Sequence, residues 1–175
     1  VPRYEAYQNG TYHLSTDGSH VDGSKGAFDA SGRRIALLVS RFNSEITDRL
    51  LHGAVECLTE HGAAESDIDV VFVPGAWELP QTAAKVVRQT RHDAVVALGC
   101  VIRGDTPHFD YVCSEVSAGL GAVARDAAIP VLFGVLTTDD AAQALARAGA
   151  GKNNKGYECA IAALEMIEVF RELES

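Results

Sequence analysis

RIALLVS, from Arg34 to Ser40, contains five apolar residues in a row and is the clearest indication of the fold class. A short run of this kind predicts a buried strand. A helical pattern follows from Ser44 to Glu60, and it places one set of apolar residues on a single face: Ile46, Leu50, Ala54, Cys57 and Leu58. A buried strand followed by an amphipathic helix indicates an α/β protein.

The same alternation continues towards the end of the chain. Further strands are predicted over Ile68–Val73, Asp93–Leu98 and Val131–Leu136. Further helices are predicted from Pro80 to about Thr90, from about Asp110 to Ala127, from a cap at Thr137 or Thr138 to Ala148, and from about Asn154 to Leu173. Continuously apolar strands separated by helices are typical of a parallel sheet covered on both faces. We therefore expect an α/β, flavodoxin-like three-layer sandwich around a four-stranded parallel sheet.

The beginning of the chain, Val1 to Ser31, differs in composition from the rest. It is rich in Gly, Ser, Asp and Tyr and shows little periodicity, so it cannot build a core of its own. We expect an N-terminal arm that is mobile or docked on a neighbouring subunit, where it would add an edge strand to the sheet. Residues 32–175 then form a single domain, in keeping with a length of 175 residues.

Composition and charge argue against several classes of function. A net charge of −9 disfavours nucleic-acid binding, because phosphate backbones require a basic surface. No apolar run approaches the roughly 20 residues of a membrane helix, and a secretory signal is expected to be absent or already removed. The four cysteines, Cys57, Cys100, Cys113 and Cys159, show no C-x-x-C spacing. We therefore expect reduced thiols in a cytoplasmic protein and no zinc site.

In a sheet of this kind, ligands bind beyond the carboxyl ends of the strands. Phe42 follows the first strand, and Trp77 and Glu78 follow the second. The two aromatic rings either form a stacking platform for a planar ligand or seal the top of the core. Glu78 either accepts hydrogen bonds from a ligand or stands in a first helical turn, where the helix dipole favours a carboxylate.

The loop after the third strand contains Gly104, Asp105 and Thr106, directly before a helix. Backbone N–H groups and a Thr hydroxyl at a helix N-terminus can cradle a phosphate, although the same residues also form ordinary turns and caps. His108 is the only one of six histidines placed at the carboxyl end of a strand. It is a candidate for moving protons near neutral pH, or for a hydrogen bond that braces the loop.

Several segments together carry a resemblance to a known family. They are SRFN at 40–43, PGAWELP at 74–80, GCVIRGDTPHFDYVC at 99–113, FGVLTT at 133–138, QALARAG at 143–149 and NKG at 154–156. From about Arg34 to its C-terminus the chain resembles the 6,7-dimethyl-8-ribityllumazine synthases. It departs from them at Trp77, where Phe is more usual. A flavodoxin or a receiver domain is disfavoured, because neither a phosphate loop nor paired acidic residues follow the first strand.

The resemblance implies a transferase of riboflavin biosynthesis. Such enzymes condense 5-amino-6-(D-ribitylamino)uracil with 3,4-dihydroxy-2-butanone 4-phosphate, giving 6,7-dimethyl-8-ribityllumazine, phosphate and water, and they use no metal or organic cofactor. It also implies a homopentamer or an icosahedral capsid of twelve pentamers, with riboflavin synthase as a candidate partner. The segment from Ala148 to Lys155 has no obvious insertion, which favours the capsid. The alternative is a non-catalytic relative that binds lumazine or flavin or forms a shell.

The same resemblance assigns roles to individual residues. Phe42 would stack on the pyrimidine ring and Glu78 would bind the ribityl hydroxyls. The rest of the pyrimidine side would consist of Ala76, Trp77, Cys100, Val101 and Ile102. The butanone phosphate would be held by Asp105, Thr106 and Arg147, and His108 would transfer protons. Phe133 and Arg147 would reach the pocket from the adjacent subunit.

Overall fold

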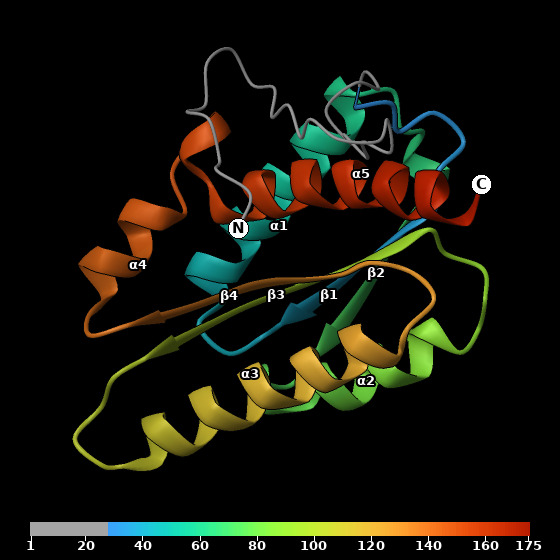
Figure 1. The fold of residues 1–175 in the computed structure, drawn as a ribbon. Helices are drawn as coiled ribbons and strands as arrows, with labels where there is room; N and C mark the ends of the chain where they lie inside the picture. The colour runs from blue at the N-terminus through green and yellow to red at the C-terminus, as the bar shows by residue number, and fades with distance from the viewer. Residues whose placement is uncertain (1–27) are drawn as a thin grey trace, which may run out of the picture.

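The computed structural model describes residues 28–175, so the expected arm lies outside the described residues except for positions 28–31. The strands are β1 (Ile35–Ser40), β2 (Ile68–Val73), β3 (Ala94–Ile102) and β4 (Val131–Thr138). The α-helices are α1 (Ser44–Glu60), α2 (Leu79–Val87), α3 (His108–Asp126), α4 (Ala141–Arg147) and α5 (Lys155–Glu174). The predicted α/β class is confirmed, because these elements form a three-layer sandwich (Figure 1).

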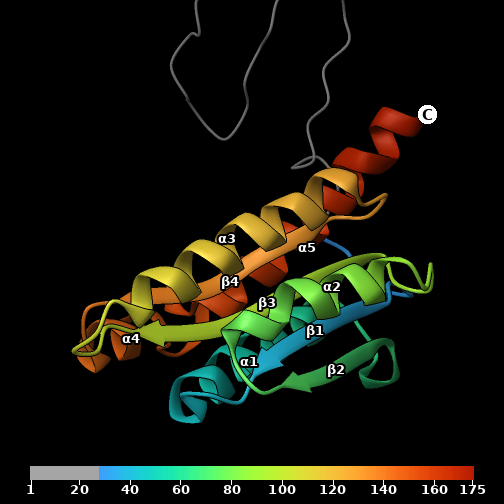
Figure 2. The same cartoon turned by 90° about the horizontal axis from the view of Figure 1, so that it is seen from below.

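The strands of the described sheet are all parallel and lie in the order β2-β1-β3-β4. Helices α1 and α5 cover one face of the sheet, and α2 and α3 cover the other, as Figures 1 and 2 show from two directions. All strands therefore end at the same side of the molecule. Helix α4 and the N-terminus of α3 lie at this side too, so it gathers the residues that follow each strand (Figure 1).

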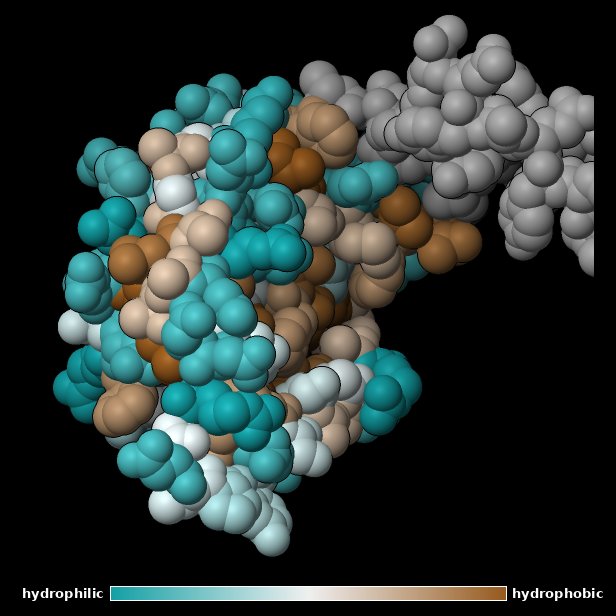
Figure 3. Space-filling view, turned by 90° about the vertical axis from the view of Figure 1, so that its left-hand side faces the viewer, coloured by the Kyte–Doolittle hydropathy of each residue, from teal (hydrophilic) through white to brown (hydrophobic). Residues whose placement is uncertain are grey.

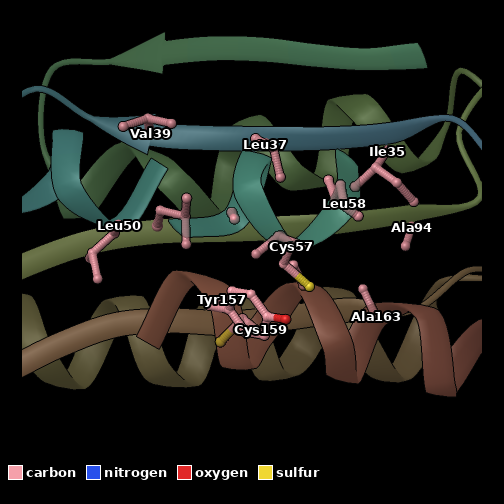
Figure 4. Packing of buried hydrophobic residues seen from close by; sticks show 14 of the residues in the cluster. Ile35, Leu37, Val39, Leu50, Cys57, Leu58, Ala94, Tyr157, Cys159 and Ala163 are labelled. Atoms are coloured by element: carbon pink, nitrogen blue, oxygen red, sulfur yellow. The ribbon is translucent and has the colours of Figure 1, made fainter. Parts of the chain in front are cut away.

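Strand β1 is buried along its whole length, since it lies between two strands and two layers of helices. Ile35, Leu37 and Val39 face α1 and α5 and share one core with side chains of both helices (Figure 4). Ala36 and Leu38 belong to the second core, on the side of α2 and α3. Because both faces of the strand are covered, both sets of alternating side chains are apolar, which explains the unbroken apolar run.

Two strands run further than predicted. Strand β3 continues past Leu98 and β4 past Leu136, because residues 99–102 pair in register with residues 135–138. The predicted strand ends at Leu98 and Leu136 are therefore wrong. A Cβ atom at Gly99 would stand 3.1 Å from Cδ1 of Leu79, so this glycine allows close packing against α2 instead of making a turn.

The expected caps of the short helix α4 are also wrong. Thr137 and Thr138 are the last residues of β4, because the pairing with β3 extends to them. The cap is Asp140, whose carboxylate accepts a hydrogen bond from the backbone N–H of Gln143 (2.8 Å). An Asp at this position satisfies an N–H that has no partner inside the helix.

Two helices have different ends from those predicted. Helix α2 stops at Val87, short of Thr90, which has a φ of 52° that is incompatible with a continuing right-handed helix. Helix α3 begins at His108 and not near Asp110. His108 therefore belongs to the first turn of a helix. Within residues 28–175, no helix is long and apolar enough to cross a bilayer.

Helices α1 and α5 approach each other closely where α5 begins. The N-cap of α5 is the buried Asn154, whose Oδ1 accepts hydrogen bonds from the backbone N–H groups of Gly156 (2.8 Å) and Tyr157 (3.3 Å). Its Nδ2 donates to the carbonyl oxygens of Arg49 in α1 (2.9 Å) and of Gly149 (2.8 Å). Asn154 therefore joins three segments: α1, the connection after α4 and the start of α5.

Candidate active site

A cavity of about 550 Å³ opens at the carboxyl ends of β1, β2 and β3. Its lining residues come from the segments after these strands and from the start of α3. They are Phe42, Pro74, Gly75, Ala76, Trp77, Glu78, Cys100, Val101, Ile102, Gly104, Thr106, His108, Phe109 and Val112. This volume is in the range that small-molecule ligands occupy.

Phe42 is presented by a tight turn between β1 and α1. Its side chain is 70% exposed, so it lies at the cavity and does not seal the core. The next residue, Asn43, has a left-handed backbone with φ 60° and ψ 45°. Its Nδ2 donates a hydrogen bond to the carbonyl oxygen of Cys100 (2.9 Å) at the end of β3. This bond ties the turn that carries Phe42 to the wall of the cavity.

The segment after β2 supplies an aromatic ring and a carboxylate. Ala76, Trp77 and Glu78 form a short 3-10 turn before α2, and Trp77 is 49% exposed at the cavity. The Glu78 carboxylate accepts a hydrogen bond from the backbone N–H of Gly75 through Oε2 (2.9 Å). This bond holds the carboxylate against its own turn, where it lines the cavity and has a second oxygen that can accept hydrogen bonds from a ligand.

The end of β3 forms an apolar wall. Cys100 is buried, whereas Val101 and Ile102 are half-buried and reach the cavity. Burial raises the pKa of the Cys100 thiol to about 11. The thiol is therefore protonated at neutral pH and is not a nucleophile there.

The loop after β3 brings Gly104 and Thr106 to the cavity, and α3 brings His108, Phe109 and Val112. His108 is exposed and is the first residue of α3. Backbone N–H groups at a helix N-terminus favour an anion. This end of the cavity therefore combines an imidazole, a hydroxyl and a site suited to negative charge.

Three of the predicted site residues lie outside the lining of this cavity: Asp105, Phe133 and Arg147. Asp105 is exposed on the same loop. Phe133 is 40% exposed on β4, one of the two edge strands of the described sheet. Arg147 is exposed at the end of α4. The cavity of one chain thus brings together the other predicted residues but not these three.

Reasoning from the sequence missed part of the cavity wall. Phe109 and Val112 were given no role, although residues 108 and 112 are four apart and share one face of a helix. Placing the start of α3 at His108 would have revealed them. Arg103 was also passed over, although it contacts Phe109 and two carboxylates of the site region.

The hydropathy of the surface at this end of the molecule is mixed. Figure 3 looks onto the side where α4 lies and shows brown hydrophobic side chains between teal hydrophilic ones. Phe42 after β1, Tyr111 in the first turns of α3 and Leu145 in α4 are large apolar side chains that are exposed.

Comparisons with known proteins give one consistent family. The model of the family described as 6,7-dimethyl-8-ribityllumazine synthase matches residues 32–171. Relatives from two strains of Clostridium kluyveri, each named 6,7-dimethyl-8-ribityllumazine synthase, are 51% identical over 150 residues. Each alignment covers 86% of this chain and 97% of the relative.

Proposed function

This chain belongs to the 6,7-dimethyl-8-ribityllumazine synthase family, and from that premise we propose that the cavity beyond β1, β2 and β3 is its active site. The enzyme is a transferase of riboflavin biosynthesis. It condenses 5-amino-6-(D-ribitylamino)uracil with 3,4-dihydroxy-2-butanone 4-phosphate to form 6,7-dimethyl-8-ribityllumazine, phosphate and water. The observation that carries the proposal for the site is the single cavity that gathers Phe42, Glu78, Thr106 and His108.

The pyrimidine substrate is assigned to the part of the cavity that lies between the end of β3 and the segments that follow β1 and β2. Phe42 is exposed there and can stack on a planar ring. The Glu78 carboxylate, oriented by Gly75, can accept hydrogen bonds from the ribityl hydroxyls. The apolar side chains of Val101 and Ile102 complete a slot in which a flat heterocycle loses contact with water.

The butanone phosphate is assigned to the loop before α3. Thr106 offers a hydroxyl there, and the N-terminus of α3 offers backbone N–H groups with a favourable dipole. Asp105, on the same exposed loop, would contribute its backbone. Arg147 of a neighbouring copy would add a guanidinium, which can hold a phosphate through two parallel hydrogen bonds.

The protein has two main tasks in this reaction: it positions the two substrates and it transfers protons. The aromatic amine attacks the ketone and water leaves, which gives an imine. Elimination of phosphate then leaves an enol, which tautomerises to a ketone. The ribitylamino nitrogen attacks this ketone, and loss of a second water closes the second ring. Holding both substrates in one cavity makes these steps effectively intramolecular. His108 stands where it can take protons from the amine and return them to departing water, and a guanidinium stabilises the charge of the departing phosphate.

We also propose that the site is completed by a second copy of the chain. Phe133 and Arg147 lie outside the cavity of their own chain, and both are exposed. A head-to-tail contact in which one copy covers the cavity of the next closes into a ring, here a homopentamer. The short segment between α4 and α5, which contains only a 3-10 turn over Gly151–Asn153, favours twelve pentamers in an icosahedral capsid. The native mass of the particle distinguishes a pentamer from a capsid.

A cytoplasmic location is part of the same proposal. All four cysteines carry free thiols, which is in keeping with a reducing compartment. Riboflavin synthase is the proposed partner, because it would consume the lumazine product. Co-purification of the two proteins from one lysate tests this pairing.

The direct test of the function is to mix the two substrates with the purified protein and to follow the green fluorescence of the lumazine. A fluorescence increase that depends on both substrates and on the protein is expected. A protein that binds the lumazine product but gives no increase over the uncatalysed reaction would instead be a non-catalytic relative.

A further inference from the structure

Arg103 connects three parts of the site region without lining the cavity itself. Its backbone N–H donates to the carbonyl oxygen of Thr138 (2.9 Å), which continues the pairing of β3 with β4. Its Nε donates to Oδ1 of Asp139 (3.2 Å), and its Nη1 donates to Oδ1 of Asp110 (3.2 Å). Its Cζ atom lies 4.1 Å from the ring centroid of Phe109. One guanidinium therefore has two carboxylates at its edge and an aromatic ring on its face.

Each of these partners belongs to a segment that the proposed chemistry uses. Phe109 lines the cavity. Asp110 belongs to the first turn of α3, two residues after His108. Asp139 lies in the turn before α4, and its backbone N–H donates to Oε1 of Gln143 inside that helix (3.1 Å). Arg103 thus links the loop of one cavity to the helix that ends at Arg147.

The contacts of Arg103 with Asp110, Asp139 and Phe109 restrain the loop more than a single surface ion pair would. An exposed pair of one cation and one carboxylate has little effect, because water screens it. The side chains of Arg103, Asp110 and Asp139 are also exposed, at 45%, 62% and 71%. The difference is that the two carboxylates approach different nitrogens of one planar group, and the ring of Phe109 restricts how that group can rotate. The hydrogen bond from Arg103 to Asp139 raises the pKa of Arg103 above its ordinary value, so the guanidinium stays charged.

We propose that Arg103 is a positioning residue for the condensation, which fixes the loop 103–107 and the first turn of α3 at the geometry that binds the butanone phosphate. This inference rests on the proposed function, because it assigns that loop to the phosphate. Without these contacts of Arg103, Thr106 in the loop and His108 in the first turn of α3 would still be present but would be held less firmly. Small displacements of such groups weaken binding in the transition state.

The test compares Arg103→Met and Arg103→Lys with the unaltered enzyme in steady-state kinetics, with each substrate varied in turn. Arg103→Met removes both ion pairs and keeps an unbranched side chain. It is expected to raise the KM for the butanone phosphate about tenfold, while the KM for the pyrimidine substrate changes less than about twofold. Lys keeps the charge but not the planar guanidinium group. The KM of Arg103→Lys for the butanone phosphate is therefore expected to lie between those of the unaltered enzyme and Arg103→Met.

Two further variants separate positioning from direct phosphate binding. If Arg103 acts through its partners, Asp110→Asn and Asp139→Asn raise the KM for the butanone phosphate in the same direction as Arg103→Met. If Arg103 binds the phosphate itself, removal of a competing carboxylate leaves this KM unchanged or lowers it, which would overturn the proposal. Arg171→Met is the matched control, because Arg171 pairs with Glu168 in α5 on the other side of the sheet.

The outcomes also distinguish this inference from the proposed function. If the unaltered protein forms no lumazine, the function fails before Arg103 is tested. If it is active and Arg103→Met keeps both KM values, or raises both equally together with a lower thermal midpoint, Arg103 has no positioning role. A selective rise in one KM, with a circular dichroism spectrum and thermal midpoint like those of Arg171→Met, supports it.

Discussion

Asn43 adopts a left-handed conformation at the point where the chain leaves β1 for α1, and its side chain bonds to the carbonyl oxygen of Cys100. A residue other than glycine in this conformation needs a local reason, since its Cβ crowds the backbone. Asn tolerates the conformation better than most residues. The backbone N–H of Phe42 also donates a hydrogen bond to the carbonyl oxygen of Pro74 (3.1 Å). Together with the bond from Asn43 to Cys100, it fixes the direction in which the Phe42 ring leaves the sheet.

Asn43→Ala is expected to weaken both stability and pyrimidine binding. It removes the bond to Cys100 and leaves a Cβ at positive φ, for a combined cost of about 2 kcal/mol. Asn43→Gly loses the same bond without the strain, so it should be about 1 kcal/mol more stable than Asn43→Ala. Thermal unfolding of both variants measures the difference. Equal stability of the two would show that strain at Asn43 is negligible.

The two side chains proposed to act at the phosphate end, His108 and Arg147, should respond differently to truncation. His108→Ala is expected to slow turnover modestly, because water can carry protons in its place. Arg147→Ala is expected to be the more damaging change, with a loss of about tenfold or more in kcat/KM for the butanone phosphate, since a bidentate contact to a charged group disappears. Steady-state kinetics with each substrate varied checks the order. Near-normal kinetics of Arg147→Ala would contradict the proposal that Arg147 binds the phosphate.

Among the elements, the start of α5 depends most on a single side chain. Asn154 is 2% exposed, and its side chain makes four hydrogen bonds, two as donor and two as acceptor. The backbone of α5 passes so close to α1 that a Cβ atom at Gly156 would lie 1.9 Å from the carbonyl oxygen of Leu50. The cap and the glycine together allow the two helices to meet at this point.

Asn154→Ala is expected to destabilise the fold by about 2–4 kcal/mol, because it leaves buried backbone groups without partners. The neighbouring Asn153 is exposed, and Asn153→Ala serves as the matched control, with an expected change within about 0.5 kcal/mol. Denaturant or thermal unfolding of both variants gives the comparison. Similar stabilities of Asn154→Ala and Asn153→Ala would contradict the proposed stabilising role of Asn154.

The elements also show what the sequence could and could not predict. The bounds of α1 and β2 agree with the pattern of apolar residues, because each of these elements has a clear boundary in its own sequence. The ends of β3 and β4 could not be read in this way, since the pairing of residues 99–102 with residues 135–138 depends on a contact between distant segments. The start of α3 was missed because Thr106 and Pro107 look like a loop, although His108 already has a helical backbone.

The prediction of the candidate site was limited for a similar reason. Phe42, Trp77 and Glu78 were identified from their position after a strand, and they line one cavity. Phe133 and Arg147 were named only through a resemblance, and the cavity of a single chain does not include them. Their proposed contribution is to the cavity of a neighbouring copy, and local sequence patterns do not reveal contacts between copies.

At the scale of the whole molecule, the buried thiols set the response to alkaline pH. Burial raises the pKa of Cys57 to about 12 and that of Cys100 and Cys159 to about 11, from an ordinary value of 9.0. A hydrogen bond to Glu60 raises the pKa of the Tyr157 phenol to about 12. In each case folding favours the protonated group. The stability from these groups is complete below pH 9 and is lost as the pH rises through 11 to 12.

The thermal midpoint is therefore expected to show no fall due to these groups up to about pH 9 and to fall above it. Thiolate absorbance in the ultraviolet, recorded on the folded protein, should remain low for Cys57, Cys100 and Cys159 until unfolding begins. Cys113 is only half-buried and is the thiol expected to react with alkylating reagents in the native state. Full thiolate absorbance near pH 9 in a folded protein would contradict this account.

Each active site is proposed to combine the cavity of one chain with Arg147 of the next. Complementation between two impaired variants tests this arrangement. Phe42→Ala impairs the cavity and Arg147→Ala impairs the contribution of the neighbour, so a ring assembled from both chains contains some sites with neither change. Co-expression in equal amounts is expected to restore lumazine formation at about one site in four. Activity no greater than the average of the two separate variants would contradict the shared site.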